Sequence, residues 1–378
     1  MNLIFKRIKG SGGITRSFSA FVILSLLFVF ACSQPEKNDD LPIRGGVDLK
    51  TVEFNFRSFP TMRSITGEVL NFEGRLSMLN RVLVNDSKLI ITDLNADAMV
   101  QGYDLDQGKY LGVLSKKGFG PNEMMGTWTL SRSLDGNGFT VFDNQLRKLN
   151  NFHFSDTGFV LNQTQVAKSE AVISSAIQVT DSTLLAIDIR SGSVLVEVSL
   201  DGTRSLATMD WDQIGIPYDL ERALLNDLFQ GYLFASADQA HFLRTSLVLN
   251  EAMLSSRNLK KAIRFQGPEA PSSEFRLITA NSRKQVELDF QKTTYTYLGG
   301  DVTQKAVYLL YAGQKWEGKP GEKYYANKVF QFALDGTPLK AYELDVAISC
   351  LSVDEENGVF YGVSANQENT ELLRFTLE

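Results

Sequence analysis

Residues 134–142 read LDGNGFTVF, a tight Asp-Gly turn that leads directly into a run of β-forming side chains. The same order of turn and apolar run returns at residues 85–91 (NDSKLII) and 180–188 (TDSTLLAID). Aspartates mark six such positions, at intervals of 49, 46, 57, 63 and 53 residues: Asp86, Asp135, Asp181, Asp238, Asp301 and Asp354. One four-stranded propeller blade takes about 40 to 50 residues. The repeat therefore predicts an all-β chain folded as a six-bladed β-propeller.

A second set of turns falls inside the predicted blades. Each of these turns contains Asp and Gly and separates two β-rich segments: 105–108, 155–158, 200–203 and 334–337. Because glycine tolerates the positive φ that tight hairpins require, we expect these turns to join the third and fourth strands of successive blades. Closure of the ring requires one more strand. An N-terminal strand, either 52–56 or 67–70, is expected to complete the last blade, formed by 359–377.

Two segments depart from the strand pattern. Residues 219–229 place leucines at helical spacing after Asp219, a residue type that caps helix N-termini. We expect a short helix there whose apolar face covers the propeller, and binding of a partner through that face is the alternative. Residues 267–289, which begin GPEAPSS, are expected to form a charged insertion at the surface.

The stretch KKGFGPNEMMG at residues 116–126 is the best candidate for a chemical motif. Phosphate-binding loops read Gly-x-x-x-x-Gly-Lys-Ser/Thr, or Gly-x-Gly-x-x-Gly between a strand and a helix, and this stretch fits neither pattern. We therefore expect a loop between two blades, from an outer strand to the next inner strand. It is built on Gly118, Gly120, Pro121, Asn122 and Glu123. The Glu123 carboxylate is expected to accept hydrogen bonds from backbone amides near that inner strand, and a position at the mouth of the central channel is the alternative.

Residues 1–31 are expected to be a secretory signal peptide. Four basic residues precede an apolar run at 18–30, which is shorter than the roughly 20 residues of a membrane-spanning helix. The run ends in Val-Phe-Ala before Cys32, which resembles the lipobox of bacterial lipoproteins, although Phe30 departs from the small residue usual at its place. We expect acyl chains such as palmitate on Cys32, a flexible lipidated tether at 32–46 and the propeller at 47–378. A secreted protein with an incidental cysteine is the alternative.

The remaining cysteine and the net charge limit the chemistry. Once Cys32 is acylated, Cys350 has no disulfide partner, and its apolar neighbours predict a buried thiol. The formal charge is −6, and loss of the four cations of the signal leaves −10: Lys6, Arg7, Lys9 and Arg16. This charge argues against nucleic acid and anionic lipid as partners.

Residues that could carry catalysis form no recognisable set. His153 and His241 lie in apolar, strand-like contexts, so we expect surface strand residues rather than metal ligands. The sequence has no Gly-x-Ser-x-Gly motif for a hydrolase nucleophile. Several carboxylates are of the kind that binds calcium in propeller lactonases, without forming an evident ligand set: Asp86, Asp93, Asp97, Asp143 and Asp188. We therefore predict no catalytic residues, no metal ligands and no cofactor.

Three stretches resemble one known family. They are GFGPNE at 118–123, AVYLLYAG at 306–313 and the series of strands and turns from Val329 to Tyr361. These stretches are similar to the TolB-like six-bladed β-propeller lipoproteins of the Bacteroidota. The resemblance implies the propeller and a membrane anchor, and it implies no reaction. The acidic stretch EKNDD at 36–40 is similar to signals that send such lipoproteins to the cell surface.

From the residues and the resemblance together, we expect a lipid-anchored protein of the bacterial cell envelope, at the outer membrane and exposed on the cell surface. Its propeller is expected to be a non-catalytic binding or assembly module for a protein or a glycan. The sequence indicates neither the identity of the partner nor the oligomeric state. The alternative is a propeller hydrolase or lyase that acts on glycans or lactones through axial carboxylates, with calcium as a candidate metal.

Overall fold

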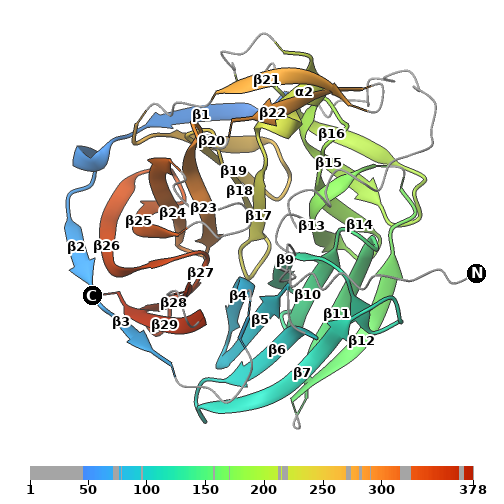
Figure 1. Cartoon of the computed structure of the whole chain (residues 1–378), viewed down its shortest axis with the longest axis vertical. Helices are drawn as coiled ribbons and strands as arrows, with labels where there is room; N and C mark the ends of the chain where they lie inside the picture. Colours follow the sequence, from blue (N-terminus) through green and yellow to red (C-terminus); the bar gives the residue numbers. More distant parts are fainter. Residues whose placement is uncertain are drawn as a thin grey trace, which may run out of the picture. The chain divides into compact units, whose positions relative to one another are not determined.

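The computed structural model describes most of the chain between residues 46 and 377. The described ranges are 46–70, 76–77, 79–94, 97–155, 158–169, 171–211, 214, 220–269, 274–280, 283–289, 291–315, 325–365 and 370–377. The predicted signal peptide, Cys32 and nearly all of the predicted tether lie outside these residues. Six β-sheets follow one another around a central axis (Figure 1). The predicted all-β, six-bladed propeller is therefore confirmed.

The first three blades are consecutive antiparallel sheets in which the first strand is innermost. Blade 1 contains β4 (Leu79–Asn85), β5 (Lys88–Asp93), β6 (Ala98–Asp104) and β7 (Lys109–Lys117), and β8 (Glu123–Met124) runs parallel to the end of β7. Blade 2 contains β9 (Thr127–Arg132), β10 (Gly138–Asp143), β11 (Lys148–Ser155) and β12 (Gly158–Val166). Blade 3 contains β13 (Ile173–Thr180), β14 (Thr183–Asp188), β15 (Ser193–Ser199) and β16 (Ser205–Asp210).

The last three blades each include a strand from the N-terminal part of the chain. Blade 4 contains β17 (Gly231–Ala235), β18 (His241–Ser246), β19 (Glu251–Ser256), β20 (Lys261–Gln266) and β1 (Asp48–Glu53). Blade 5 contains β23 (Thr294–Val302), β24 (Ala306–Lys315), β25 (Ala326–Ala333), β26 (Pro338–Ile348) and β2 (Met62–Ile65). Blade 6 contains β27 (Leu351–Asp354), β28 (Val359–Ala365), β29 (Thr370–Thr376) and β3 (Gly67–Val69).

Residues 48–69 form a strap along the outer edges of blades 4, 5 and 6 (Figure 1). β1 pairs in parallel with β20, β2 pairs in parallel with β26, and β3 pairs antiparallel with β29. Between β1 and β2 lies the 3-10 helix η1 (Phe56–Ser58), where the Asn55 side chain accepts a hydrogen bond from the amide of Arg57. Of the two predicted closing strands, the one near 67–70 therefore completes the last blade. Residues 52–53 extend blade 4 instead.

The predicted turns lie where the blade repeat requires them. The Asp-Gly turns after residues 104, 199 and 333 join third to fourth strands, and Gly108, Gly202 and Gly336 have φ values of +59°, +80° and +87°. Five of the six marker aspartates lie at or beside the turn between the first two strands of a blade. Asp301 differs, because it belongs to the inner strand β23 and is buried.

Apolar side chains fill the spaces between neighbouring sheets. Between blades 1 and 2, Ile90 and Val100 pack with Phe139 and Phe152, whose rings stack with centroids 4.7 Å apart. Each large apolar side chain that is fully buried in this way stabilises the fold by about 1.5 to 3 kcal/mol. Because every sheet is covered on both faces, the blade strands are rich in apolar residues without strict alternation.

Helix α2 and one hairpin lie outside the six blades. Helix α2 (Arg222–Leu228) is shorter than the predicted 219–229; Asp219, its predicted cap, lies outside the described residues, and Glu221 occupies the N-cap position without a side-chain cap bond. Leu224, Leu225 and Leu228 are buried as predicted. The predicted charged insertion contains the hairpin β21 (Phe275–Ala280) and β22 (Arg283–Leu288), which contacts α2. Within the described part of the chain, no helix has the length and apolar character that a bilayer crossing requires.

Candidate functional site

The predicted inter-blade loop joins the outer strand β7 to the inner strand β9. The Glu123 carboxylate accepts a hydrogen bond from the amide of Gly120 at 2.8 Å, so its partner is within the loop and not at the inner strand as predicted. Its Oε2 would lie only 2.0 Å from a Cβ at Gly118, whose φ is +157°. These two facts explain the glycine at position 118. They also direct the carboxylate into the loop rather than to a ligand.

Further hydrogen bonds hold the rest of this loop in place. The Lys148 ammonium donates to the carbonyl of Gly120 at 2.6 Å, and the Ser115 hydroxyl donates to the carbonyl of Asn122 at 2.7 Å. From blade 2, the Thr164 hydroxyl donates to the carbonyl of Pro121 at 3.4 Å. A loop fixed by partners from two blades has one defined conformation.

Phe119 at the tip of this loop is 76% exposed, which is the largest value among the big apolar side chains of the described residues. Val166, at the end of β12, is 53% exposed and pairs in register with Lys148, whose ammonium reaches the loop. Lys116 and Lys117, just before the loop, are exposed as well. Together Phe119, Val166, Lys116 and Lys117 are called the Phe119 patch below. A loop held by these hydrogen bonds thus places a large apolar ring in solvent, and two exposed lysines precede it in the sequence.

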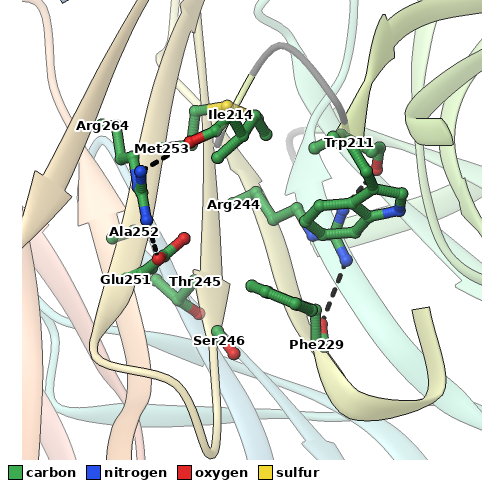
Figure 2. Close-up of a pocket in the computed structure, with 11 residues that line it drawn as sticks. Trp211, Ile214, Phe229, Arg244, Thr245, Ser246, Glu251, Ala252, Met253 and Arg264 are labelled. Carbon is green, nitrogen blue, oxygen red and sulfur yellow. Dashed lines mark hydrogen bonds and ion pairs between the residues drawn. The ribbon is translucent and has the colours of Figure 1, made fainter. Parts of the chain in front are cut away.

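A second candidate site is a small cavity at the junction of blades 3 and 4 (Figure 2). Its polar and charged lining comes from blade 4: Arg244, Thr245, Ser246, Glu251 and Arg264. Val194 of blade 3, and Trp211, Ile214 and Phe229 from the connection between the two blades, supply apolar walls. The cavity has a volume of about 20 Å³, which is room for about one water molecule.

Arg244 forms one side of the cavity and connects three parts of the fold. Its guanidinium donates to the carbonyls of Val194 and of Phe229, and to the side-chain oxygen of Asn226. It also lies against the Trp211 ring, with the guanidinium carbon 4.9 Å from the ring centroid. All three acceptors are neutral. Burial lowers the pKa of Arg244 to about 9, although the charge of Glu251 acts in the opposite direction.

Arg264 forms the opposite side and is paired with a carboxylate. Its guanidinium donates to Glu251 and, at 2.6 Å, to the carbonyl of Ile214 (Figure 2). The charges that line the cavity are therefore two guanidinium groups and one carboxylate, a net charge of +1. Three buried polar atoms of residues that line the cavity have no hydrogen-bond partner among the described residues: Trp211 Nε1, Thr245 Oγ1 and Arg264 Nε.

Three of the five carboxylates considered for calcium accept hydrogen bonds from the backbone. Asp93, Asp143 and Asp188 each end the second strand of a blade and are buried. Each accepts a hydrogen bond from an amide that precedes the innermost strand of its blade, at residues 77, 125 and 172. Asp86 lies in a first-hairpin turn, and Asp97 is exposed beside β6. The described residues contain no group of three or more His, Cys, Asp or Glu that could hold a metal ion.

The other singled-out residues lie apart from one another. His153 is on β11 of blade 2, 3.6 Å from the Asp135 carboxylate, whereas His241 is on β18 of blade 4. Cys350 is buried within the apolar cluster between blades 6 and 1. Sequence reasoning missed Arg244 and Arg264, because a single Arg within an apolar strand belongs to no motif. The signal that could have found them is the apolar pattern of β18 and β20, in which an Arg stands where an apolar residue is expected.

Comparison with known proteins identifies one family. A family model described as "TolB-like 6-blade propeller-like" matches residues 57–356. A solved structure of a candidate exported protein from Bacteroides fragilis NCTC 9343 is 12% identical, with a TM-score of 0.49, over 86% of this chain and 98% of that one. A member of the duf4221 family from Bacteroides vulgatus ATCC 8482 is 10% identical, with a TM-score of 0.49, over 84% and 97%. The WD40 repeats of RRP9 are 10% identical, with a TM-score of 0.48, over 82% and 97%. No curated protein matches.

Proposed function

Because the chain belongs to the TolB-like six-bladed propeller family, we propose that it is a lipid-anchored binding module of the bacterial cell envelope, attached through Cys32. The basic n-region, the apolar run and the Ala-Cys junction support export and acylation. Each CH₂ group of an acyl chain that enters the bilayer contributes about 0.8 kcal/mol to membrane binding. Several chains on one cysteine would therefore anchor the protein stably. Export to the outer membrane and the cell surface belongs to this proposal and is supported by the EKNDD stretch at 36–40.

One observation carries the binding role, namely the exposure of Phe119 on a loop that the four hydrogen bonds described above hold in shape. An aromatic ring in water gains nothing for the fold, and aromatic residues are the commonest anchors of protein interfaces. A side chain held in advance also loses little entropy on binding. The loop therefore has the properties of a contact point for a partner.

The side chains of the Phe119 patch indicate which kind of partner it would bind. Lys116 and Lys117, three and two residues before Phe119 in the sequence, are exposed on a chain whose formal charge is −6. A protein that offers an apolar pocket rimmed by Asp or Glu side chains would complement both features. We propose such a protein as the partner, and a glycan that stacks on the ring is the competing outcome of the test.

Capture from native membranes tests this function. The intact lipoprotein carries a photo-crosslinking amino acid at position 119 in one sample and at position 277 in another, because Leu277 is also half exposed but lies on the β21–β22 hairpin. One protein band specific to position 119, lost with Lys116→Glu and Lys117→Glu together, is the expected result. Equal labelling at both positions, or labelling of carbohydrate only, would contradict the proposed protein partner.

Labelling with a radioactive fatty acid tests the anchor separately. The wild-type chain should take up the label and sediment with membranes, and Cys32→Ala should do neither. Label that is undiminished in the variant would refute acylation at Cys32 while leaving the binding role to the crosslinking experiment.

A further inference from the structure

The outer strand of blade 2 is an open edge of its sheet. Among the described residues β12 pairs only with β11, and it lies on the outer rim of the ring (Figure 1). The strap covers the outer strands of blades 4, 5 and 6, and β7 of blade 1 pairs with β8 at its end and contains three lysines. β12 is nine residues long, and residues 158–167 include no Asp, Glu, Lys, Arg or Pro. Charged residues and proline are the usual protection of an edge strand against pairing with another chain.

The C-terminal half of β12 directs two residues outward. The amide of Ala167 donates to the carbonyl of Arg147 at 2.9 Å. Backbone groups of an antiparallel strand point alternately toward one neighbour and away from it. The amide and carbonyl groups of Thr164 and Val166 therefore point away from β11.

The N-terminal half of β12 also directs two residues outward. The amide of Phe154 on β11 donates to the chain that enters β10, so the next residue back, His153, faces β12. His153 is paired with Val160. The backbone groups of Phe159 and Leu161 therefore point away from β11. None of the four outward residues of β12 has a backbone partner on this side among the described residues.

The outward positions are symmetric about the midpoint between Asn162 and Gln163. They are residues 159, 161, 164 and 166. A bulge in the pairing with β11 adds one residue between 161 and 164 and so produces this symmetry. All four side chains lie on the same face of the sheet, because their partners on β11 are residues 154, 152, 150 and 148.

A second copy of this strand satisfies the edge by symmetry. If a two-fold axis passes through the midpoint, residue 159 lies opposite residue 166 of the copy. Residue 161 likewise lies opposite residue 164. Each outward residue then faces an outward residue, and the two bulges meet at the axis. A strand of another protein would have to match the bulge by its own sequence, whereas the identical strand matches it automatically.

We propose that β12 is the interface of a symmetric homodimer, in which two copies of the strand pair antiparallel about the midpoint between Asn162 and Gln163. Two-fold dimers are the commonest homo-oligomers. The strand has no charge, so no like charges face each other across the axis. Val166, which is 53% exposed, would lie opposite Phe159 of the copy and lose exposed apolar surface. The dimer does not depend on the partner of Phe119 or on the lipid anchor.

Cysteine crosslinking tests the register. Val160 is expected opposite Gln165 of the copy, at a pair of residues without mutual hydrogen bonds, where Cα atoms are about 4.5 Å apart and a disulfide can form. The full chain is used in detergent with an excess of micelles. Chains with Val160→Cys mixed with chains with Gln165→Cys should give a disulfide-linked dimer of one each under mild oxidation. Either variant alone should give little, because identical positions are offset by five residues, or about 17 Å.

The crosslinking result can overturn the proposal in two ways. The first is the absence of a mixed dimer at every protein concentration. The second is an equal yield of dimer from the mixture and from each variant alone, which would indicate random collision.

Charge variants test the affinity. Asn162→Lys together with Gln163→Lys places two pairs of like charges across the axis, and should raise the dissociation constant of the dimer by about tenfold in sedimentation equilibrium. The same two positions changed to Glu should do likewise, and the Lys and Glu variants should form a heterodimer when mixed. Thr51→Lys together with Met62→Lys is the matched control, because it adds the same charge at exposed positions of the strap. It should leave the dissociation constant unchanged.

The wild-type chain gives the final criterion. A chain that stays monomeric at the highest soluble concentration would overturn the proposal, and so would a dimer that both charged variants leave intact.

Discussion

Arg81 lies over the ring of Tyr232, with its guanidinium carbon 3.5 Å from the ring centroid. Arg81 belongs to the innermost strand of blade 1 and Tyr232 to that of blade 4, three blades away. The contact therefore crosses the centre of the ring, where it joins two blades that share no sheet. Arg81 is nearly buried and also donates a hydrogen bond to the carbonyl of Asn80 at 2.8 Å.

A double-mutant cycle on this pair should give a coupling energy of about 0.5 to 2 kcal/mol, the range of cation–π contacts between exposed and desolvated settings. The variants are Arg81→Met, Tyr232→Leu and the combination, and the free energy of unfolding is measured by urea denaturation. If the losses in the free energy of unfolding of the two single variants add up to that of the double variant, the two side chains do not attract each other.

The strap is predicted to contribute to the core and not merely to cover it. Phe54 contacts the rings of Phe330 and Phe332 with centroids 5.4 and 4.9 Å apart. Phe54→Ala should therefore lower the free energy of unfolding by about 3 to 5 kcal/mol. Met62→Ala, on the same strap but 48% exposed, should cost less than about 1 kcal/mol. Similar losses for the two variants would mean that the strap is loosely attached. Denaturation followed by circular dichroism distinguishes these outcomes.

Asn226 is predicted to be the main attachment of α2 to blade 3. Its buried amide group donates to the carbonyls of residues 188, 191 and 193 at 2.7 to 2.9 Å, and its oxygen accepts a hydrogen bond from Arg244. Asn226→Ala removes these hydrogen bonds from a buried site, and each polar group that loses its last partner costs about 1 to 3 kcal/mol. We expect a loss of at least about 2 kcal/mol in denaturant titrations. Asn162→Ala, at an exposed position of β12, should change stability by less than about 0.5 kcal/mol.

The contribution of Asp143 to the free energy of unfolding should increase as the pH falls. Burial raises the pKa of Asp143 in the folded state, although the amides of Leu146 and Met125 donate to its carboxylate. A group whose folded pKa exceeds its unfolded value binds more protons when folded. Its contribution to stability therefore grows as the pH falls through the folded pKa and levels off below the unfolded value of about 3.9.

The comparison with Asp143→Asn isolates this effect, because other titrating groups cancel. The free energy of unfolding of the wild type minus that of the variant should rise between about pH 7 and pH 4. If this difference in the free energy of unfolding fell as the pH was lowered, the pKa of Asp143 would be lowered in the folded state and the prediction would be wrong.

The blade repeat could be predicted from sequence because its signals are local. The turn at 134–138 and its copies fix hairpins within a few residues, and the spacing of Asp86, Asp135 and Asp181 gives the length of a blade. The strap could be foreseen only in part. Its strands find partners more than 200 residues away, at 261–266 and 341–344, and no short-range pattern specifies a pairing of that kind.

The candidate sites could not be predicted from the sequence for a different reason. Composition places Phe119 among residues that are usually buried, and only the folded loop reveals that its ring faces solvent. Arg244 receives its acceptors from blade 3 and from the C-terminal end of α2, so its environment exists only after the sheets have met. Glu123 was expected to serve an inner strand and serves its own loop, because Gly118 and Gly120 leave room for its carboxylate there.

The strands of the strap can pair only after the strands that they pair with have been synthesised. Its first strand needs residues 261–266, and its last needs residues 373–375 near the end of the chain. The part of the polypeptide that leaves the ribosome first is thus the last that can reach its final neighbours. A chain that ended before residue 373 would leave residues 67–69 without the antiparallel strand that pairs with them.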